Sequence, residues 1–195
     1  MQLQGLHIGF AMTGSHCTIA KVLPQMAKLV ESGADVIPII SDSVRITTSK
    51  YGTAGHLREE INRITHKYPW ETLVEVEPVG PEQLLDLLVI MPCTGNTLAK
   101  ISLGISDTPV TFACKAHLRN NRPVVIGIST NDALSANAAN LGALLNRKHV
   151  YFIPFGQDNP FQKSNSLVFK PELLLNTIDA ALNGKQYQPL ILSWQ

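Results

Sequence analysis

Short apolar runs alternate along the chain with longer segments in which apolar positions recur every three or four residues. The short runs end in small polar residues and are typical of buried strands, because strands of a parallel sheet are covered on both faces. The longer segments have the spacing of one helix face. The predicted strands cover residues 6–12, 35–40, 87–91, 123–128 and 150–154. The predicted helices cover residues 17–31, 55–67, 98–105, 108–118, 134–145 and 171–182.

This alternation predicts βαβ units and therefore an α/β fold. We expect a single-domain, Rossmann-like three-layer sandwich with a mostly parallel sheet and helices on both faces. The domain is expected to span residues 1–195, with 184–195 as a C-terminal tail. Three shorter segments, residues 73–76, 81–86 and 156–166, are predicted as a strand, a helix and a mobile loop, in that order.

The composition excludes several classes of protein. Charged residues make up 16% of the chain, the formal net charge is +1, and no run of Lys and Arg is longer than a pair, so nucleic acid is not the expected partner. The N-terminus lacks the basic start of a secretory signal, and no stretch approaches the roughly 18 apolar residues of a membrane span. We therefore expect a cytoplasmic protein without a membrane segment. The low charge content favours coverage of its surface by other subunits.

The cysteines and histidines do not form a recognisable structural motif. The three cysteines have no CxxC spacing and the six histidines are scattered, so neither a disulfide framework nor a metal site is predicted. Cys17 and Cys114 fall on predicted helices and are expected in the core. Cys93 follows a strand, where a reactive thiol could lie, but a small buried residue is the favoured interpretation.

Small polar residues follow four of the predicted strands. In an open parallel sheet, ligands bind at the carboxyl ends of the strands, which meet at one edge. Hydroxyl and amide groups beside helix N-termini suit a phosphate, although each turn alone is equally well explained as a helix cap. Since no P-loop lysine and no G-x-G-x-x-G motif is present, a mononucleotide site is expected. The residues concerned are Thr13, Gly14, Ser15, Ser41, Thr94, Gly95, Asn96, Thr97, Ser129, Thr130 and Asn131.

One of these turns belongs to a longer motif. The run PCTGNTLAKI at residues 92–101 is followed by GISD at 104–107. This pattern resembles the signature of the FMN-binding flavoproteins, which include phosphopantothenoylcysteine decarboxylases, peptidyl-cysteine decarboxylases and flavin prenyltransferases. The resemblance implies FMN as the cofactor. By the same resemblance, FMN would be held by Thr13, Gly14, Ser15, Ser41, Thr94, Gly95, Asn96 and Thr97, with Ser129 and Thr130 closing the site.

The resemblance also implies roles for two asparagines. Asn96 corresponds to a catalytic asparagine that handles a carboxylate, and an amide can donate to a carboxylate oxygen without adding charge. Asn131 corresponds to an asparagine that faces the substrate. The histidine element of the decarboxylases has no convincing counterpart in residues 45–79, where His56 and His66 are unplaced. An FMN-dependent decarboxylase is therefore kept as an alternative.

Within the family, the run STNDALSAN at residues 129–137 and the chain length are most similar to the dipicolinate synthase branch. Members of that branch work beside a separate oxidoreductase subunit. Together they make dipicolinate, a dicarboxylate of spores, from a lysine-pathway precursor of the dihydrodipicolinate type in the mother cell of a sporulating bacterium. The resemblance implies an oxidoreductase subunit that assembles as a homotrimer or a dodecamer. A non-catalytic role in assembly is the second alternative.

Overall fold

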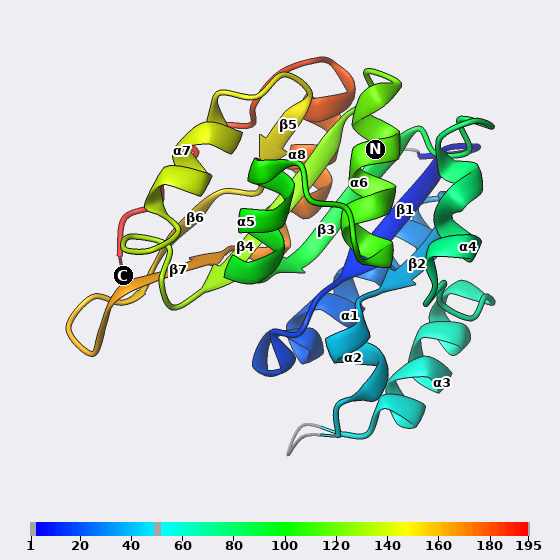
Figure 1. Ribbon diagram of the computed structural model, residues 1–195, viewed down its shortest axis with the longest axis horizontal. Helices are drawn as coiled ribbons and strands as arrows, with labels where there is room; N and C mark the ends of the chain where they lie inside the picture. The colour runs from blue at the N-terminus through cyan, green and yellow to red at the C-terminus, as the bar shows by residue number, and fades with distance from the viewer. Residues whose placement is uncertain (1–2, 49–51, 195) are drawn as a thin grey trace.

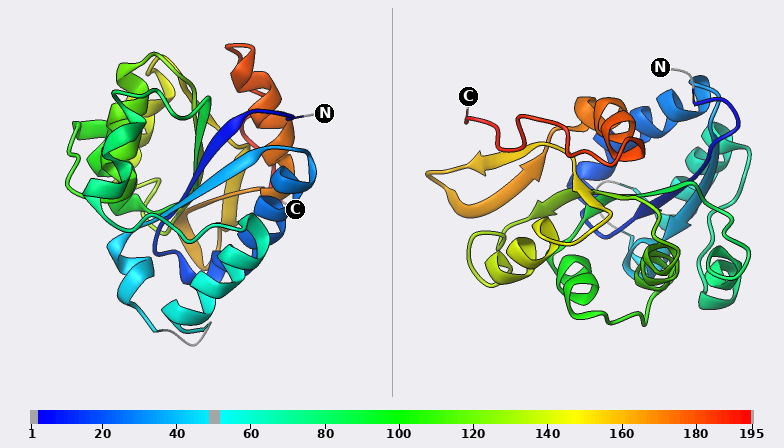
Figure 2. Two further views of the ribbon diagram at one scale, coloured as in Figure 1. Left: turned by 90° about the vertical axis from the view of Figure 1, so that its right-hand side faces the viewer. Right: turned by 90° about the horizontal axis from the view of Figure 1, so that it is seen from above.

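The computed structural model describes residues 3–48 and 52–194. Its centre is a seven-stranded sheet with the strand order β2-β1-β3-β4-β7-β6, and β5 pairs with β4 beside this path. Strands β1 to β5 pair in parallel, whereas β6 and β7 form an antiparallel hairpin. Helices α5, α6 and α7 cover one face of the sheet, and α1 and α8 cover the other (Figures 1 and 2). The expected three-layer α/β architecture with a mostly parallel sheet is confirmed.

The elements have the following bounds. The strands are β1 (His7–Met12), β2 (Asp35–Ile40), β3 (Leu87–Cys93), β4 (Val124–Thr130), β5 (Val150–Phe152), β6 (Phe155–Asn159) and β7 (Lys163–Phe169). The α-helices are α1 (His16–Glu31), α2 (Asp42–Ile46), α3 (Ala54–Thr65), α4 (Leu73–Val76), α5 (Gly95–Leu103), α6 (Pro109–Arg119), α7 (Ala138–Leu145) and α8 (Leu174–Leu182). Two 3-10 helices, η1 (Glu77–Val79) and η2 (Pro171–Leu173), complete the chain.

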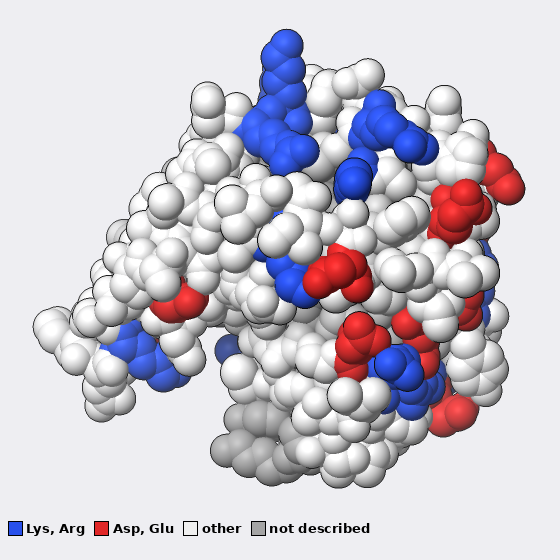
Figure 3. All heavy atoms as spheres, viewed as in Figure 1, with Lys and Arg blue, Asp and Glu red and all other residues white. Residues whose placement is uncertain are grey.

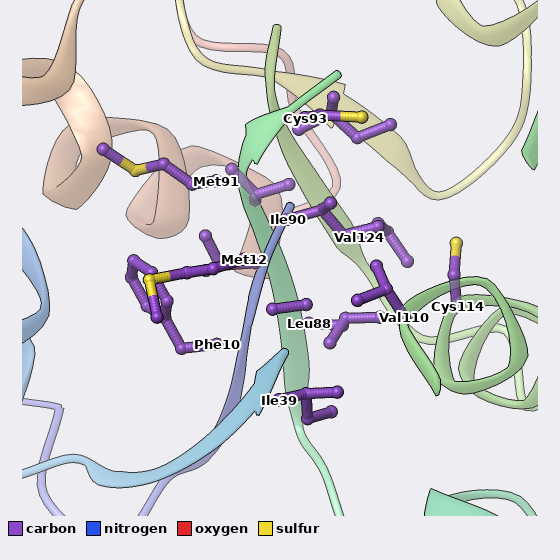
Figure 4. Packing of buried hydrophobic residues seen from close by; sticks show 14 of the residues in the cluster. Phe10, Met12, Ile39, Leu88, Ile90, Met91, Cys93, Val110, Cys114 and Val124 are labelled. Atoms are coloured by element: carbon purple, nitrogen blue, oxygen red, sulfur yellow. The ribbon is translucent and has the colours of Figure 1, made fainter. Parts of the chain in front are cut away.

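The core lies on both faces of the parallel strands. Every residue of β3 is buried, as expected for a central strand that has helices on both sides. Figure 4 shows Phe10 and Met12 of β1 on one side of the strands, with Leu88 and Ile90 of β3 on the other side facing Val110 of α6. The alternation follows from the two-residue period of a strand. This packing fixes the strand ends, which carry the predicted site.

Two of the short predicted elements are wrong. Residues 73–76 form helix α4 and not a strand, because Thr72 and Glu75 build a capping box in which each side chain accepts a hydrogen bond from the other residue's backbone N–H. Residues 81–86 contain no helix. Gln83 has a left-handed backbone with a φ of 51°, a conformation that an α-helix cannot include.

The predicted mobile loop is also wrong, since residues 156–166 belong to the β6–β7 hairpin. The turn between its strands is held by Asn159, whose Oδ1 accepts hydrogen bonds from the backbone N–H groups of Phe161 (3.1 Å) and Gln162 (2.9 Å). Strand β7 then pairs antiparallel with the end of β4 through Ser129 and Thr130. The hairpin projects from the body of the molecule (Figure 1).

Candidate functional site

The carboxyl ends of β1 and β3 are tied together. Thr13 Oγ1 donates to the backbone carbonyl of Pro92 at 2.7 Å, and the backbone N–H of Thr94 donates to Thr13 Oγ1 at 2.9 Å. Thr13 is buried and its hydroxyl is used in these contacts. The turns at residues 13–15 and 94–97 therefore lie side by side, as a shared binding site requires.

A cavity of about 400 Å³ opens at this edge of the sheet, between the start of α1, the end of β4 and the hairpin. Six of the predicted site residues line it: Gly14, Ser15, Thr94, Ser129, Thr130 and Asn131. We call this space the strand-end cavity. The space-filling view shows a deep notch between the hairpin and the rest of the molecule (Figure 3).

Three hydroxyl groups form a closed cluster in the strand-end cavity. Ser15 Oγ lies 2.9 Å from Thr18 Oγ1 and 3.0 Å from Ser129 Oγ, and Thr18 Oγ1 lies 3.1 Å from Ser129 Oγ. Each hydroxyl has one proton and two lone pairs, so the cluster can donate to or accept from a ligand by rotating its protons. We call Ser15, Thr18 and Ser129 the hydroxyl cluster.

The helices that begin at this edge lack side-chain caps. Ser15, Ser41 and Thr94 are the N-cap residues of α1, α2 and α5, and none of their side chains makes a capping hydrogen bond. Ser41 Oγ instead lies 2.9 Å from Ser43 Oγ. First-turn N–H groups without a side-chain acceptor favour an anion at the positive end of the helix dipole. The helix-cap explanation, which the sequence left open for these turns, is not the geometry adopted.

The remaining predicted residues lie around the cavity. Gly95 and Thr97 are buried on the first turn of α5, and Thr97 Oγ1 accepts a hydrogen bond from Thr94 Oγ1 at 3.3 Å. Asn96, on the same turn, is exposed and does not line the strand-end cavity. Its side chain is thus accessible from outside the chain, whereas its two neighbours are not.

Sequence reasoning missed a polar network that packs on Gly95. Asp132 accepts hydrogen bonds from Thr130 Oγ1 at 2.5 Å and from Asn137 Nδ2 at 2.8 Å. A Cβ atom on Gly95 would lie 2.6 to 2.7 Å from Thr130 Oγ1, Asn137 Nδ2 and Asp132 Oδ1, so any larger residue would have to displace this network. The run STNDALSAN contains these residues, but it was interpreted as a turn followed by a helix from 134. The helix begins later, at Ala138.

Nothing in the sequence pattern indicated that α1 and the hairpin supply charged residues to the strand-end cavity. Cys17 and Lys21 come from α1, Asp158 from β6, and Lys163 and Ser166 from β7. The prediction that Cys17 lies in the core is wrong, because its side chain is exposed on the first turn of α1. The hairpin residues were missed because their segment was predicted as a loop.

Cys93 and Cys114 are both buried, as the favoured interpretation has it. Burial raises the pKa of Cys93 far above its usual range and raises the pKa of Cys114 to about 12. Both thiols therefore remain protonated at neutral pH, and a thiolate role for Cys93 has no support.

A second, smaller cavity lies apart from the strand ends. It measures about 250 Å³ and lies between α1, α2 and α3, where apolar side chains and His56 line it. His56, unplaced by the sequence, is therefore in a different pocket from the hydroxyl cluster. Across residues 3–48 and 52–194, no group of three or more His, Cys, Asp or Glu side chains could hold a metal ion. In that same part of the chain, no helix has the length and apolar character needed to cross a membrane.

Comparison with known proteins identifies the family of the chain. The family model described as Flavoprotein matches residues 1–169. The B subunit of dipicolinate synthase from Bacillus subtilis (strain 168) is 46% identical over 190 residues, covering 97% of this chain and 95% of that protein. The crystal structure of the corresponding B subunit from Bacillus halodurans superposes with a TM-score of 0.92 at 48% identity, over 100% of both chains.

A more distant structure shares the fold alone. Burkholderia xenovorans DmrB, solved in complex with FMN, has a TM-score of 0.68 at 17% identity and covers 91% of this chain and 96% of its own. The two dipicolinate synthase proteins, by contrast, match almost the whole chain, as the resemblance at residues 129–137 implied. The chain is therefore a member of the flavoprotein family and a homologue of the B subunit of dipicolinate synthase.

Proposed function

We propose that this chain is the FMN-binding B subunit of a dipicolinate synthase. It acts in the cytoplasm of the mother cell with the A subunit, which is the oxidoreductase subunit, on a small dicarboxylate precursor of the dihydrodipicolinate type. Near full-length identity of 46% to a B subunit of this enzyme supports the assignment. A synthase with a B subunit implies an A subunit as its partner.

The observation that carries the FMN proposal is the set of helix N-termini without side-chain caps at one sheet edge. Ser15 and Thr94 begin α1 and α5 beside the strand-end cavity, and neither side chain caps its helix. Gly14 lines the same cavity, and Ser43 Oγ lies 2.6 Å from the position that a Cβ of residue 14 would take, so a glycine lets the two turns pack closely. Such a combination suits the anionic end of a phosphorylated cofactor.

The residues of the site have different proposed roles, according to their positions. When bound, FMN supplies hydride-accepting chemistry that would convert a dihydropyridine into an aromatic pyridine. We assign the phosphate and ribityl chain to Gly14, Ser15, Ser41 and Thr94, with Thr13, Gly95 and Thr97 supporting their turns from beneath. Ser129 and Thr130 close the site, and Asn131 faces the substrate. Asn96, exposed at the start of α5, is assigned to a substrate carboxylate.

Assembly is part of the proposal. Large apolar side chains such as Leu103 (69% exposed), Ile105 (43%) and Leu145 (42%) are accessible to solvent in the isolated chain. Accessible apolar residues together with a charged fraction of only 16% favour burial of part of this surface between subunits. Together with the family resemblance, this leads us to propose a homotrimer, or a dodecamer built from trimers.

The decisive experiment is the visible absorption spectrum of the purified chain, recorded with and without added FMN. We expect a bound flavin spectrum that bleaches when the precursor and the A subunit are added with air excluded. A flavin that stays oxidised under these conditions would rule out the redox role. In that case the non-catalytic assembly alternative predicts that Asn96→Ala keeps full synthase activity as long as the complex forms. Carbon dioxide release by the isolated chain would instead support the decarboxylase alternative.

A further inference from the structure

The wall of the strand-end cavity carries more positive than negative charge. Lys21 of α1 and Lys163 of β7 line it together with a single acidic residue, Asp158 of β6. Lys163 Nζ pairs with Asp158 Oδ2 at 2.5 Å. Lys21 takes part in none of the ion pairs found within residues 3–48 and 52–194. Within those residues, the cavity therefore offers an ammonium group without a carboxylate partner and a second one that is shared with Asp158.

The uncharged groups of the same wall can donate hydrogen bonds to a ligand. Ser166, which is buried, donates through Oγ to Asn131 Oδ1 at 3.4 Å. This contact occupies the acceptor end of the Asn131 amide and leaves its Nδ2 group as a donor. The hydroxyl cluster adds protons that can rotate toward a ligand. Ammonium, amide and hydroxyl donors around one cavity suit a small ligand with several anionic oxygens.

The spread of the charges distinguishes a dicarboxylate from a single phosphate. Lys21 lies six residues after Ser15 on α1, which is roughly 9 Å along the helix axis at 1.5 Å per residue. Lys163 belongs to a separate element, at the start of β7. Cations that surround one phosphate would gather at the first turn of α1, where Gly14 and Ser15 lie. Lys21 instead lies about one and a half turns further along α1, and Lys163 reaches the same cavity from the hairpin.

We propose that Lys21 and Lys163 bind the two carboxylates of a small aromatic or dihydroaromatic dicarboxylate in the strand-end cavity. This inference rests on the proposed function, since it identifies the residues that recognise the substrate of that site. Asp158 holds Lys163 in place before the ligand arrives and competes with the incoming carboxylate. It follows that removing the charge of Asp158 strengthens binding, whereas removing the charge of either lysine weakens it.

The test is a calorimetric titration of the full chain, with and without FMN, using pyridine-2,6-dicarboxylate as the probe. Lys21→Met and Lys163→Met should each weaken its binding about 10-fold, because each removes one charge-assisted hydrogen bond. Asp158→Asn should tighten binding. Lys28→Met is the matched control: Lys28 is exposed on the same face of α1, two turns further on, and lines none of the cavities described above, so it should bind like the unmodified chain.

A monocarboxylate probe sharpens the assignment. Pyridine-2-carboxylate has only one of the two anionic groups. Its binding affinity should therefore fall on substitution of one of the two lysines and not of both. A second readout is alkylation of Cys17, the exposed thiol of the same cavity. Saturating pyridine-2,6-dicarboxylate should slow this reaction in the unmodified chain and protect Cys17 far less in Lys21→Met at the same ligand concentration.

Each adverse outcome has a distinct meaning. FMN binding with unchanged dicarboxylate affinity in both lysine variants would overturn the inference and leave the proposed function standing. Loss of FMN affinity in these variants with unchanged dicarboxylate affinity would also overturn it, since the lysines would then serve the cofactor phosphate. No dicarboxylate binding by the unmodified chain overturns it as well. If the chain binds no FMN, the proposed cofactor is wrong, and the titration of the FMN-free chain still decides the role of the lysines.

Discussion

Helices α1 and α5 begin beside the strand-end cavity, and the first turns of α4 and α6 do not line it, yet all four helices have Ser or Thr as the N-cap residue. At α4 and α6 the N-cap residues Thr72 and Thr108 form complete capping boxes. At α1 and α5, Ser15 and Thr94 make no capping hydrogen bond, and the Ser15 hydroxyl joins the hydroxyl cluster instead. The same residue types thus stabilise a helix in one region and leave its N-terminus open to a ligand in the other.

This difference separates a structural region from a functional one. A cap satisfies N–H groups within the chain and stabilises the fold by about 1 kcal/mol. An open N-terminus gives up that stabilisation and retains the attraction of the helix dipole for an anion. Substitutions in the structural region should therefore lower the unfolding free energy and leave ligand affinity unchanged. Substitutions in the functional region should lower ligand affinity and leave the unfolding free energy nearly unchanged.

The largest effect on the unfolding free energy is expected in the structural region, at His117 of α6. Its side chain is fully buried, Nε2 lies 3.0 Å from the carbonyl of Pro123, and Nδ1 has no hydrogen-bond partner among the described residues. Burial lowers the pKa of His117 to about 4 from an ordinary value of 6.5. The unfolded chain therefore binds the proton first, and stability is lost as the pH falls from about 6.5 to about 4. Linkage puts this loss at about 3 kcal/mol.

Denaturant unfolding at several pH values measures this effect, with His117→Gln as the comparison. The difference in unfolding free energy between the two proteins should change across the window from about pH 6.5 to about pH 4 and stay constant above it. Parallel profiles over that window would contradict a buried neutral histidine, and FMN affinity at neutral pH should be the same in both proteins.

A smaller loss of stability is expected at Gly95, where the two regions meet. Gly95→Ala would place a methyl group within 2.7 Å of three polar atoms of the Asp132 network. Overpacking of this kind costs about 2 kcal/mol and should also weaken FMN binding, because Thr94 and Thr130 would move. Gly55→Ala is the control, since a Cβ there meets nothing within 4 Å and should stabilise α3 slightly. Equal melting temperatures for the two variants would show that the packing on Gly95 is not restrictive.

The smallest stability effect tests the comparison directly. Thr108→Ala should lower the unfolding free energy by about 1 kcal/mol and leave FMN affinity unchanged, because it removes a cap outside the cavity. Ser15→Ala should do the reverse, with little loss of stability and FMN binding weakened about 10-fold or more. Chemical denaturation and flavin titration of both variants provide the two measurements. If both variants lost stability and affinity in the same ratio, the two kinds of helix start would not differ in role.

Much of the fold was predictable because local patterns and the final structure agree there. The apolar run at residues 87–91 became the fully buried β3, and residues 35–40 match β2. Prediction failed where a local signal was outweighed by another. The apolar residues of α4 suggested a strand, although the capping box from Thr72 to Glu75 was already present in the sequence. The hairpin was not predicted, because β7 pairs with Ser129 and Thr130, which are far from it along the chain, and local patterns do not reveal such pairing.

Some residues of the candidate site were likewise predictable from the sequence, and others were not. Ser15, Thr94 and Asn131 could be found because each follows a strand, and parallel topology brings strand ends together. Lys21 and Lys163 could not, since one lies on the exposed side of a helix and the other in a segment without a clear strand pattern. No periodicity indicates which exposed lysines border a cavity. The two lysines come to border the same cavity only when the hairpin pairs with β4.

The attachment of the hairpin to β4 has a consequence for turnover. β4 runs parallel to β3 and β5 through its buried part, and only its last two residues, Ser129 and Thr130, pair with β7. The base of the hairpin is also held by the core, because Phe155, Leu167 and Phe169 are buried in it. The tip, residues 158–165, contains no buried residue, so displacing it exposes little apolar surface and needs only a small fraction of the free energy of global unfolding. A bound molecule can therefore leave past the tip, which carries Lys163, while the base of the hairpin stays packed.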